Sequence, residues 1–68
     1  MSANPIKRRE ASAAVDRLLA FEPIPYHEAV WQVRDACKAG ADRAELIVLD
    51  LLRSGRVRRT RRGLVVIL

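Results

Sequence analysis

The spacing of apolar residues changes once along the chain, after Gly55, and this change constrains the fold more than any other feature. Up to Leu52, apolar residues recur at intervals of three and four, which is the period of a helix with one buried face. After Gly55, polar and apolar residues first alternate, and residues 64–68 are then all aliphatic, which is typical of strands. We therefore expect an α+β fold, in which helices precede a C-terminal β-hairpin.

The first helix is predicted over about residues 5–21. Asn4 is the expected N-cap and Pro5 the first helical residue, because proline has no N–H to leave unpaired there. The sequence leaves open whether residues 1–9 are helical or a flexible arm. The prolines in residues 22–25 then end the helix, since residues that precede proline favour extended backbone, and a short extended connector is expected.

Two further helices follow the connector. The second is predicted to start after Pro25 and to stop before Gly40, its expected C-cap. The third is predicted to begin at Asp42, with Glu45 three residues later in the pattern of a capping box, and to stop at Ser54-Gly55. The expected core residues of the three helices are Ala11, Ala14, Val15, Leu18, Leu19 and Phe21; Tyr26, Ala29, Val30, Val33, Ala36 and Cys37; and Ala44, Ile47, Val48, Leu51 and Leu52.

A length of 68 residues predicts one domain over residues 1–68, because a chain of this size has interior for one core only. Within it we expect residues 1–5 as an arm and residues 56–68 as the hairpin. One cysteine cannot form an internal disulfide, so stability must come from packing or from a partner. No apolar stretch is long enough to span a bilayer or reads as a signal peptide, so we expect a cytoplasmic protein with no membrane partner.

The positive charge is concentrated at the C-terminal end. Residues 51–68 hold six arginines and no acidic residue, whereas residues 1–50 hold seven basic and eight acidic residues. A clustered positive field attracts phosphate backbones or acidic protein surfaces. The asymmetry therefore predicts a negatively charged partner.

The order helix, extended piece, helix, tight turn, helix and basic hairpin, with the junction AELIVLDLLRSGRVRR over residues 44–59, resembles the winged-helix family of DNA-binding domains. The resemblance covers the chain from Pro5 to Leu68. It implies that the start of the third helix, with Arg43, approaches the major groove, while the arginines of the hairpin approach phosphates or the minor groove. The third helix departs from the family pattern, because its outward arc consists of Leu46, Leu49, Asp50 and Arg53 and contains no Asn, Gln, Ser or Thr before Ser54. We therefore expect this helix to dock on DNA more than to read bases.

The arginine cluster has two interpretations. In one, the charges only keep a solvated hairpin soluble and discourage strand aggregation. In the other, the planar guanidinium groups bind phosphate, which suits a chain in which every basic residue from position 43 onward is arginine. The residues predicted to contact nucleic acid are Lys7, Arg8, Arg9, Arg43, Arg53, Arg56, Arg58, Arg59, Arg61 and Arg62.

Several apolar residues fall outside the predicted core stripes. Trp31 lies opposite the stripe of the second helix, where it is either a contact residue or stacking surface, or is covered by the first helix or the N-terminal arm. Leu46 and Leu49 fall on the outer arc of the third helix, and the last strand is apolar on both faces. We predict that the chain buries this surface against a partner, most simply in a homodimer, through Trp31, Leu46, Leu49, Val65 and Ile67.

Enzymatic chemistry finds no support in the sequence. His27 and Cys37 lie ten residues apart on one helix, too far for a nucleophile and its base or for a metal pair, and both are expected to be structural. No phosphate-binding glycine loop is present, and we expect no enzyme, metal or cofactor.

Two functional hypotheses follow. The first is a small winged-helix protein that binds double-stranded DNA as a dimer, either a transcriptional regulator or an accessory DNA-binding factor. The alternative is a protein-interaction module, such as a phage- or plasmid-encoded inhibitor, that docks on a larger complex through Trp31, Leu46, Leu49 and the C-terminal strand. Its arginines would then meet an acidic surface of that complex or occupy its nucleic-acid groove.

Overall fold

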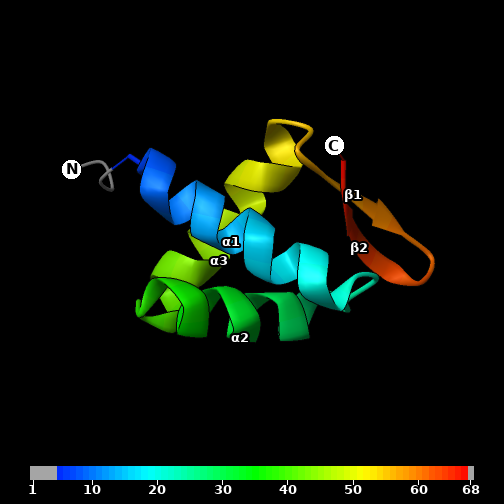
Figure 1. Ribbon diagram of the computed structural model, residues 1–68, viewed down its shortest axis with the longest axis horizontal. Coiled ribbons are helices and arrows are strands. Elements are labelled where there is room, and N and C mark those ends of the chain that lie inside the picture. The colour runs from blue at the N-terminus through cyan, green and yellow to red at the C-terminus, as the bar shows by residue number, and fades with distance from the viewer. Residues whose placement is uncertain (1–4, 68) are drawn as a thin grey trace.

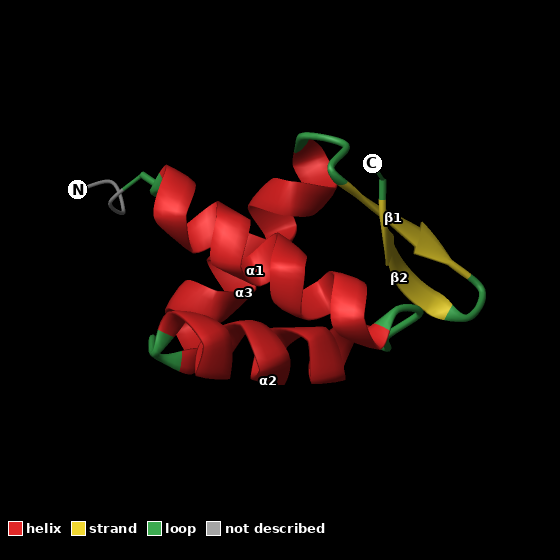
Figure 2. Ribbon diagram, in the orientation of Figure 1, coloured by secondary structure: helices red, strands yellow, loops and turns green. Residues whose placement is uncertain are grey.

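The computed structural model of the protein describes residues 5–67. Three helices precede a two-stranded antiparallel hairpin, so the predicted α+β class and the order α-α-α-β-β are confirmed (Figures 1 and 2). The elements are α1 (Arg8–Phe21), α2 (Tyr26–Cys37), α3 (Ala41–Arg53), β1 (Val57–Thr60) and β2 (Gly63–Val66). The start of α1 and the hairpin lie at opposite ends of the molecule (Figure 1).

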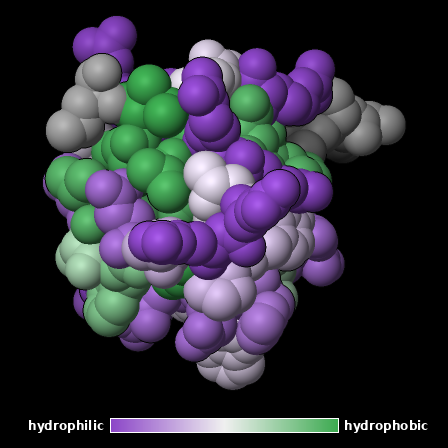
Figure 3. Space-filling view, turned by 90° about the vertical axis from the view of Figure 1, so that its right-hand side faces the viewer, coloured by the Kyte–Doolittle hydropathy of each residue, from purple (hydrophilic) through white to green (hydrophobic). Residues whose placement is uncertain are grey.

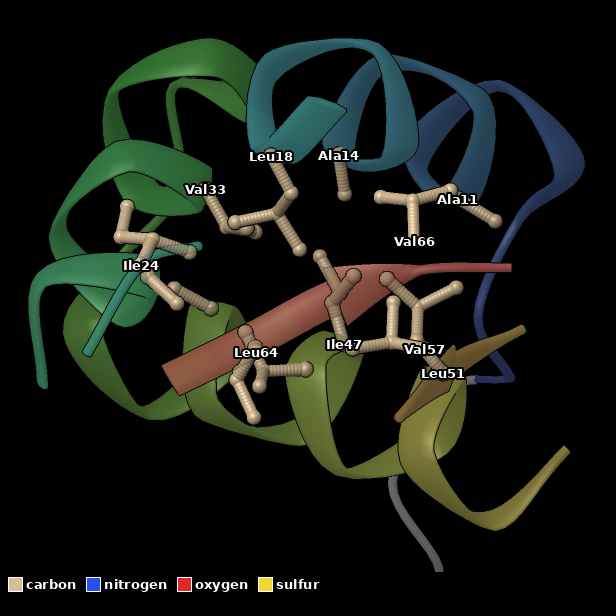
Figure 4. Packing of buried hydrophobic residues seen from close by; sticks show 13 residues of the cluster. Ala11, Ala14, Leu18, Ile24, Val33, Ile47, Leu51, Val57, Leu64 and Val66 are labelled. Atoms are coloured by element: carbon tan, nitrogen blue, oxygen red, sulfur yellow. The ribbon is translucent and has the colours of Figure 1, made fainter. Parts of the chain in front are cut away.

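All three helices and both strands contribute side chains to one hydrophobic core. Ala14 and Leu18 of α1 and Leu64 and Val66 of β2 point into the same space (Figure 4). The buried residues are Ala11, Ala14, Leu18, Ile24, Ala29, Val33, Ala44, Ile47, Val48, Leu51, Val57, Leu64 and Val66. The predicted stripes are therefore confirmed at their centres.

Two residues predicted for the core stripe of α1 are exposed, Leu19 to 38% and Phe21 to 50%. The buried arc of this helix runs through Ala11, Ala14 and Leu18. Each residue advances by about 100°, so Leu19 falls to one side of that arc and Phe21 lies in the last turn, beyond it. The prediction was wrong at these positions because the buried face of α1 is narrower than the predicted stripe and consists of two alanines and one leucine.

The start of α1 also differs from the prediction. Asn4 lies outside the described residues, and the helix begins at Arg8, not Pro5, with Lys7 in the N-cap position. The backbone N–H of Lys7 donates to Glu10 Oε1 at 3.0 Å, which stabilises the start of the helix at this position. The carbonyl oxygen of Pro5 instead accepts a hydrogen bond from Arg43 Nη2 at 2.9 Å.

At the junction between α2 and α3, the two helix caps are not the residues that the sequence predicts. Lys38, not Gly40, is the C-cap of α2, with φ 51° in the left-handed region, and its N–H faces the carbonyl oxygens of Arg34 and Asp35. Gly40 is the N-cap of α3, which begins at Ala41, so Asp42 does not cap the helix. Both predicted caps were wrong because the chain turns two residues earlier than the glycine suggests.

The hairpin closes with a two-residue loop, Arg61-Arg62, between the paired residues Thr60 and Gly63. Gly63 has φ 132°, so glycine meets the predicted need for a positive φ at this turn. The predicted extended connector is present, and Ile24 in it pairs with Leu64 through two backbone hydrogen bonds of 3.1 and 2.7 Å. The connector thereby holds the hairpin against the helices.

Candidate nucleic-acid interface

The register of the hairpin sends its arginines to different sides. Paired residues of an antiparallel ladder share a face, and the faces alternate along each strand. Arg59 pairs with buried Leu64 and so leans toward the helices, where its guanidinium carbon lies 5.6 Å from the centre of the Tyr26 ring. Arg58 pairs with Val65 and faces away from the core. Arg58 and Arg59 therefore lie on opposite faces of the hairpin.

A groove of about 490 Å³ lies between the hairpin and the start of α2. It is lined by Pro25, Tyr26, Arg59, Thr60, Arg61, Arg62, Gly63 and Leu64. Thr60 holds the loop in shape, because its hydroxyl donates to the carbonyl oxygen of Gly63 at 2.7 Å and accepts from the N–H of Arg62 at 3.2 Å. Three guanidinium groups and one aromatic ring thus border a single open groove.

The arginines of the hairpin and its approach differ from those of the helices in their ion pairing. Within residues 5–67, none of the arginines from position 53 to position 62 forms a salt bridge. Two ion pairs of the described part of the chain lie among the helices, one between Arg17 and Asp35 at 2.8 Å and one between Arg43 and Glu10 at 2.7 Å. An exposed guanidinium without an internal counter-ion keeps its donors free for an external anion.

Arg43 is not part of this arginine surface. Its guanidinium binds both carboxylate oxygens of Glu10, at 3.1 and 2.7 Å, and ties the start of α3 to that of α1. The hydrogen bonds from Arg43 are the main reason why the pKa of Glu10 falls from 4.5 to about 2, and the same contact raises the pKa of Arg43. The position expected to approach the major groove is thus occupied by a structural ion pair.

The remaining predicted contact residues are spread over the molecule. Lys7, Arg8 and Arg9 are exposed at the start of α1, at the far end from the hairpin (Figure 1). Arg53 is exposed in the last turn of α3, and Arg56 is exposed just before β1. The structure therefore brings Arg59, Arg61 and Arg62 together and separates the N-terminal basic residues from them.

Trp31 projects from the exposed side of α2 and is 64% exposed, so neither α1 nor any other described segment covers it. The guanidinium carbon of Arg34 lies 5.0 Å from the centre of its ring, within cation–π distance. A shallow groove of about 310 Å³ borders the indole and is lined by Trp31, Arg34, Asp35, Lys38 and Ala39. The exposed interpretation of this residue fits the structure.

The outer side of α3 is apolar and acidic. Leu46 and Leu49 are exposed there, as are Asp42, Glu45 and Asp50. Glu45 also accepts a hydrogen bond of 3.0 Å from the Tyr26 hydroxyl. Burial is the main cause of the raised pKa of Tyr26, and this hydrogen bond is the second cause. Carboxylates repel phosphate, so this helix face is a poor match for the DNA backbone.

Cys37 and His27 do not form a site together. The Cys37 thiol is half-buried and donates to the carbonyl oxygen of Glu10 at 3.5 Å, and burial is the main cause of its raised pKa. A raised pKa disfavours the reactive thiolate. Within residues 5–67, no three His, Cys, Asp or Glu side chains gather in a way that could hold a metal ion.

Tyr26 is the groove residue that the sequence analysis missed, because its place in the helical stripe assigned it to the core. The signal was its position immediately after Pro25, since the first residue of a helix lies at the rim of the packed face.

Of the helices that the structure describes, none is long and apolar enough to cross a membrane. Comparison of the chain with protein-family models, with curated proteins and with solved structures gave no match.

Proposed function

We propose that this chain is a winged-helix protein that binds double-stranded DNA through its hairpin, as a dimeric transcriptional regulator or accessory DNA-binding factor. The observation that carries the proposal is the groove lined by Tyr26, Arg59, Arg61 and Arg62, whose arginines form no salt bridge within the described residues 5–67. Guanidinium groups bind phosphate oxygens in a bidentate fashion, and a two-residue loop held by Thr60 places Arg61 and Arg62 beside Arg59 of β1.

The distribution of charge over the elements supports the hairpin as the principal contact. Arg43 is engaged by Glu10, and the outer side of α3 carries Asp42 and Asp50, so the helix offers little to a phosphate backbone. The proposed role of α3 is to hold the hairpin, which it contacts through the core. Affinity then comes from phosphate neutralisation, which has little dependence on DNA sequence.

The experiment is binding to a random-sequence duplex across a salt series, measured by anisotropy of labelled DNA. Neutralising four phosphates predicts that log K falls with log salt with a slope of about −4. The triple variant R59A/R61A/R62A is expected to keep its circular dichroism spectrum and to lose about three units of that slope. A wild-type protein that fails to bind at low salt would exclude the proposal.

A second candidate function rests on the exposed apolar residues of α2 and α3. Trp31, at 64% exposure and beside Arg34, has the composition of a protein-contact hot spot, and Leu46, at 42%, adds exposed apolar surface. In this case the chain docks on a larger protein, and the arginines speed the encounter with an acidic surface. The W31A and L46D variants would then abolish binding to that partner, whereas R59A/R61A/R62A would mainly lower the association rate.

A further inference from the structure

The outer face of the hairpin, which points away from the core, is basic along one strand and aliphatic along the other. Arg58 of β1 lies beside Val65 of β2, and the N–H of Ile67 donates to the carbonyl oxygen of Arg56 at 2.9 Å, which adds one more pair on the same face. Ile67 is 44% exposed, and both arginines are exposed. Seen from the hairpin end of the molecule, a group of hydrophobic residues lies beside hydrophilic ones (Figure 3).

The outer face of α3 has the same apolar content and the opposite charge. Leu46 and Leu49 are exposed to 42% and 39%, on the side of the helix away from Ile47 and Leu51 in the core. The exposed carboxylates around the two leucines are Asp42, Glu45 and Asp50, and Arg53 in the last turn is the basic residue on this side of the described helix.

We propose that these two faces bind each other in a dimer of this chain, the outer hairpin face of each copy against the outer α3 face of the other. Val65 and Ile67 would cover Leu46 and Leu49, and Arg58 would meet the carboxylate of Asp50. The inference rests on the dimer included in the proposed function and states which surfaces form it. Arg59, Arg61 and Arg62 remain on the groove side, free for DNA.

The charges of the two faces favour pairing of the hairpin face with the α3 face over pairing of either face with itself. A hairpin face against a second hairpin face would place the arginine row of one copy near that of the other, and two α3 faces would bring carboxylates together. The hairpin face against the α3 face instead pairs arginine with carboxylate and aliphatic side chains with leucine. In a dimer this contact forms twice about a two-fold axis, because the hairpin face of each copy lies on the α3 face of the other.

The test is a reciprocal charge reversal, followed by sedimentation equilibrium without DNA at low salt. Wild-type protein is expected to associate with rising concentration, and R58E or D50R alone to weaken association at least tenfold. An equal mixture of the two variants should associate again, because the D50R chain supplies an intact hairpin face and the R58E chain an intact α3 face. Circular dichroism of each variant verifies that it is folded.

The matched control is R34E, which reverses an arginine beside Trp31 on α2, outside both faces. It is expected to associate like wild type. A monomeric wild type, association unchanged in R58E and D50R, loss of association in R34E instead, or a mixture that stays monomeric would each overturn the inference. Because no DNA is present, these outcomes are independent of the salt-series result: a protein that self-associates as described but ignores DNA refutes the proposed function alone.

Discussion

At the scale of single residues, Gly63 is the glycine that tolerates a side chain least. Its φ of 132° lies in a region that side chains rarely adopt, and a Cβ there would lie 2.5 Å from the carbonyl oxygen of Ile24. We predict that G63A lowers the free energy of unfolding by about 3 kcal/mol, because it adds backbone strain and pushes the connector off the hairpin. Urea unfolding followed by circular dichroism measures the loss.

Gly55 provides the control for this prediction. Its φ is also positive, at 81°, but a Cβ there would have no atom within 4 Å. G55A should therefore cost only the conformational term, about 1 to 2 kcal/mol. Equal losses in the two variants would show that the close approach of Ile24 does not matter.

The ion pair between Glu10 and Arg43 predicts a dependence of stability on acid. The pKa of Glu10 is lowered to about 2 in the folded chain from 4.5, so the unfolded chain binds a proton first as pH falls. The contribution of this carboxylate is complete above pH 4.5 and is lost as the pH falls toward 2. Thermal unfolding from pH 6 to 2 should show this loss in wild type.

The E10Q variant should be less stable than wild type at pH 6 and should approach it near pH 2, because it has no carboxylate to protonate. E28Q, which changes an exposed glutamate outside any ion pair in the described residues, should follow the wild-type profile. An E10Q profile parallel to that of wild type over the whole range would contradict the assignment.

At the scale of elements, the end of α2 offers a stabilising change. Lys38 adopts φ 51°, where a side chain costs energy that glycine avoids. K38G is expected to raise the free energy of unfolding by about 0.5 to 1 kcal/mol, with A39G as the control that gains nothing, since Ala39 has no positive φ. Both are measured by urea unfolding, and a loss of stability in K38G would contradict the prediction.

The elements themselves could be predicted from the sequence, and so could the end of α1, the start of α2 and the end of α3, whereas the start of α1 and the caps between α2 and α3 could not. Apolar spacing fixes which face of each helix is buried, and that pattern is spread over many residues. A cap depends on one or two residues and on what the chain does next. Gly40 was assigned to the end of α2 because glycine is common there, but Lys38 turns the chain first and Gly40 starts α3.

The candidate site was predicted by residue type and not by arrangement. That the hairpin is basic follows from the sequence, but the separation of Arg58 from Arg59 depends on strand register, which periodicity alone did not assign. Arg43 shows a second limit: its partner Glu10 lies 33 residues away, so only the packing of α1 on α3 brings them together.

For the molecule as a whole, DNA binding should depend on where the basic residues lie as well as on how many there are. Arg8 and Arg9 lie at the opposite end of the molecule from Arg61 and Arg62 (Figure 1). We predict that R61A/R62A reduces the salt slope of DNA binding by about 2 and that R8A/R9A reduces it by less than half of that, although both remove two charges. Equal effects would point to binding by net charge alone.

The exposed indole on α2 also determines how this protein can be observed. Trp31 is the only tryptophan, and its ring is largely in water in the folded chain, so its emission should be nearly the same before and after unfolding. Anything that docks on α2 would remove that water and shift the emission to shorter wavelength. The emission wavelength of Trp31 should therefore report binding of a partner to α2 and not unfolding of the chain.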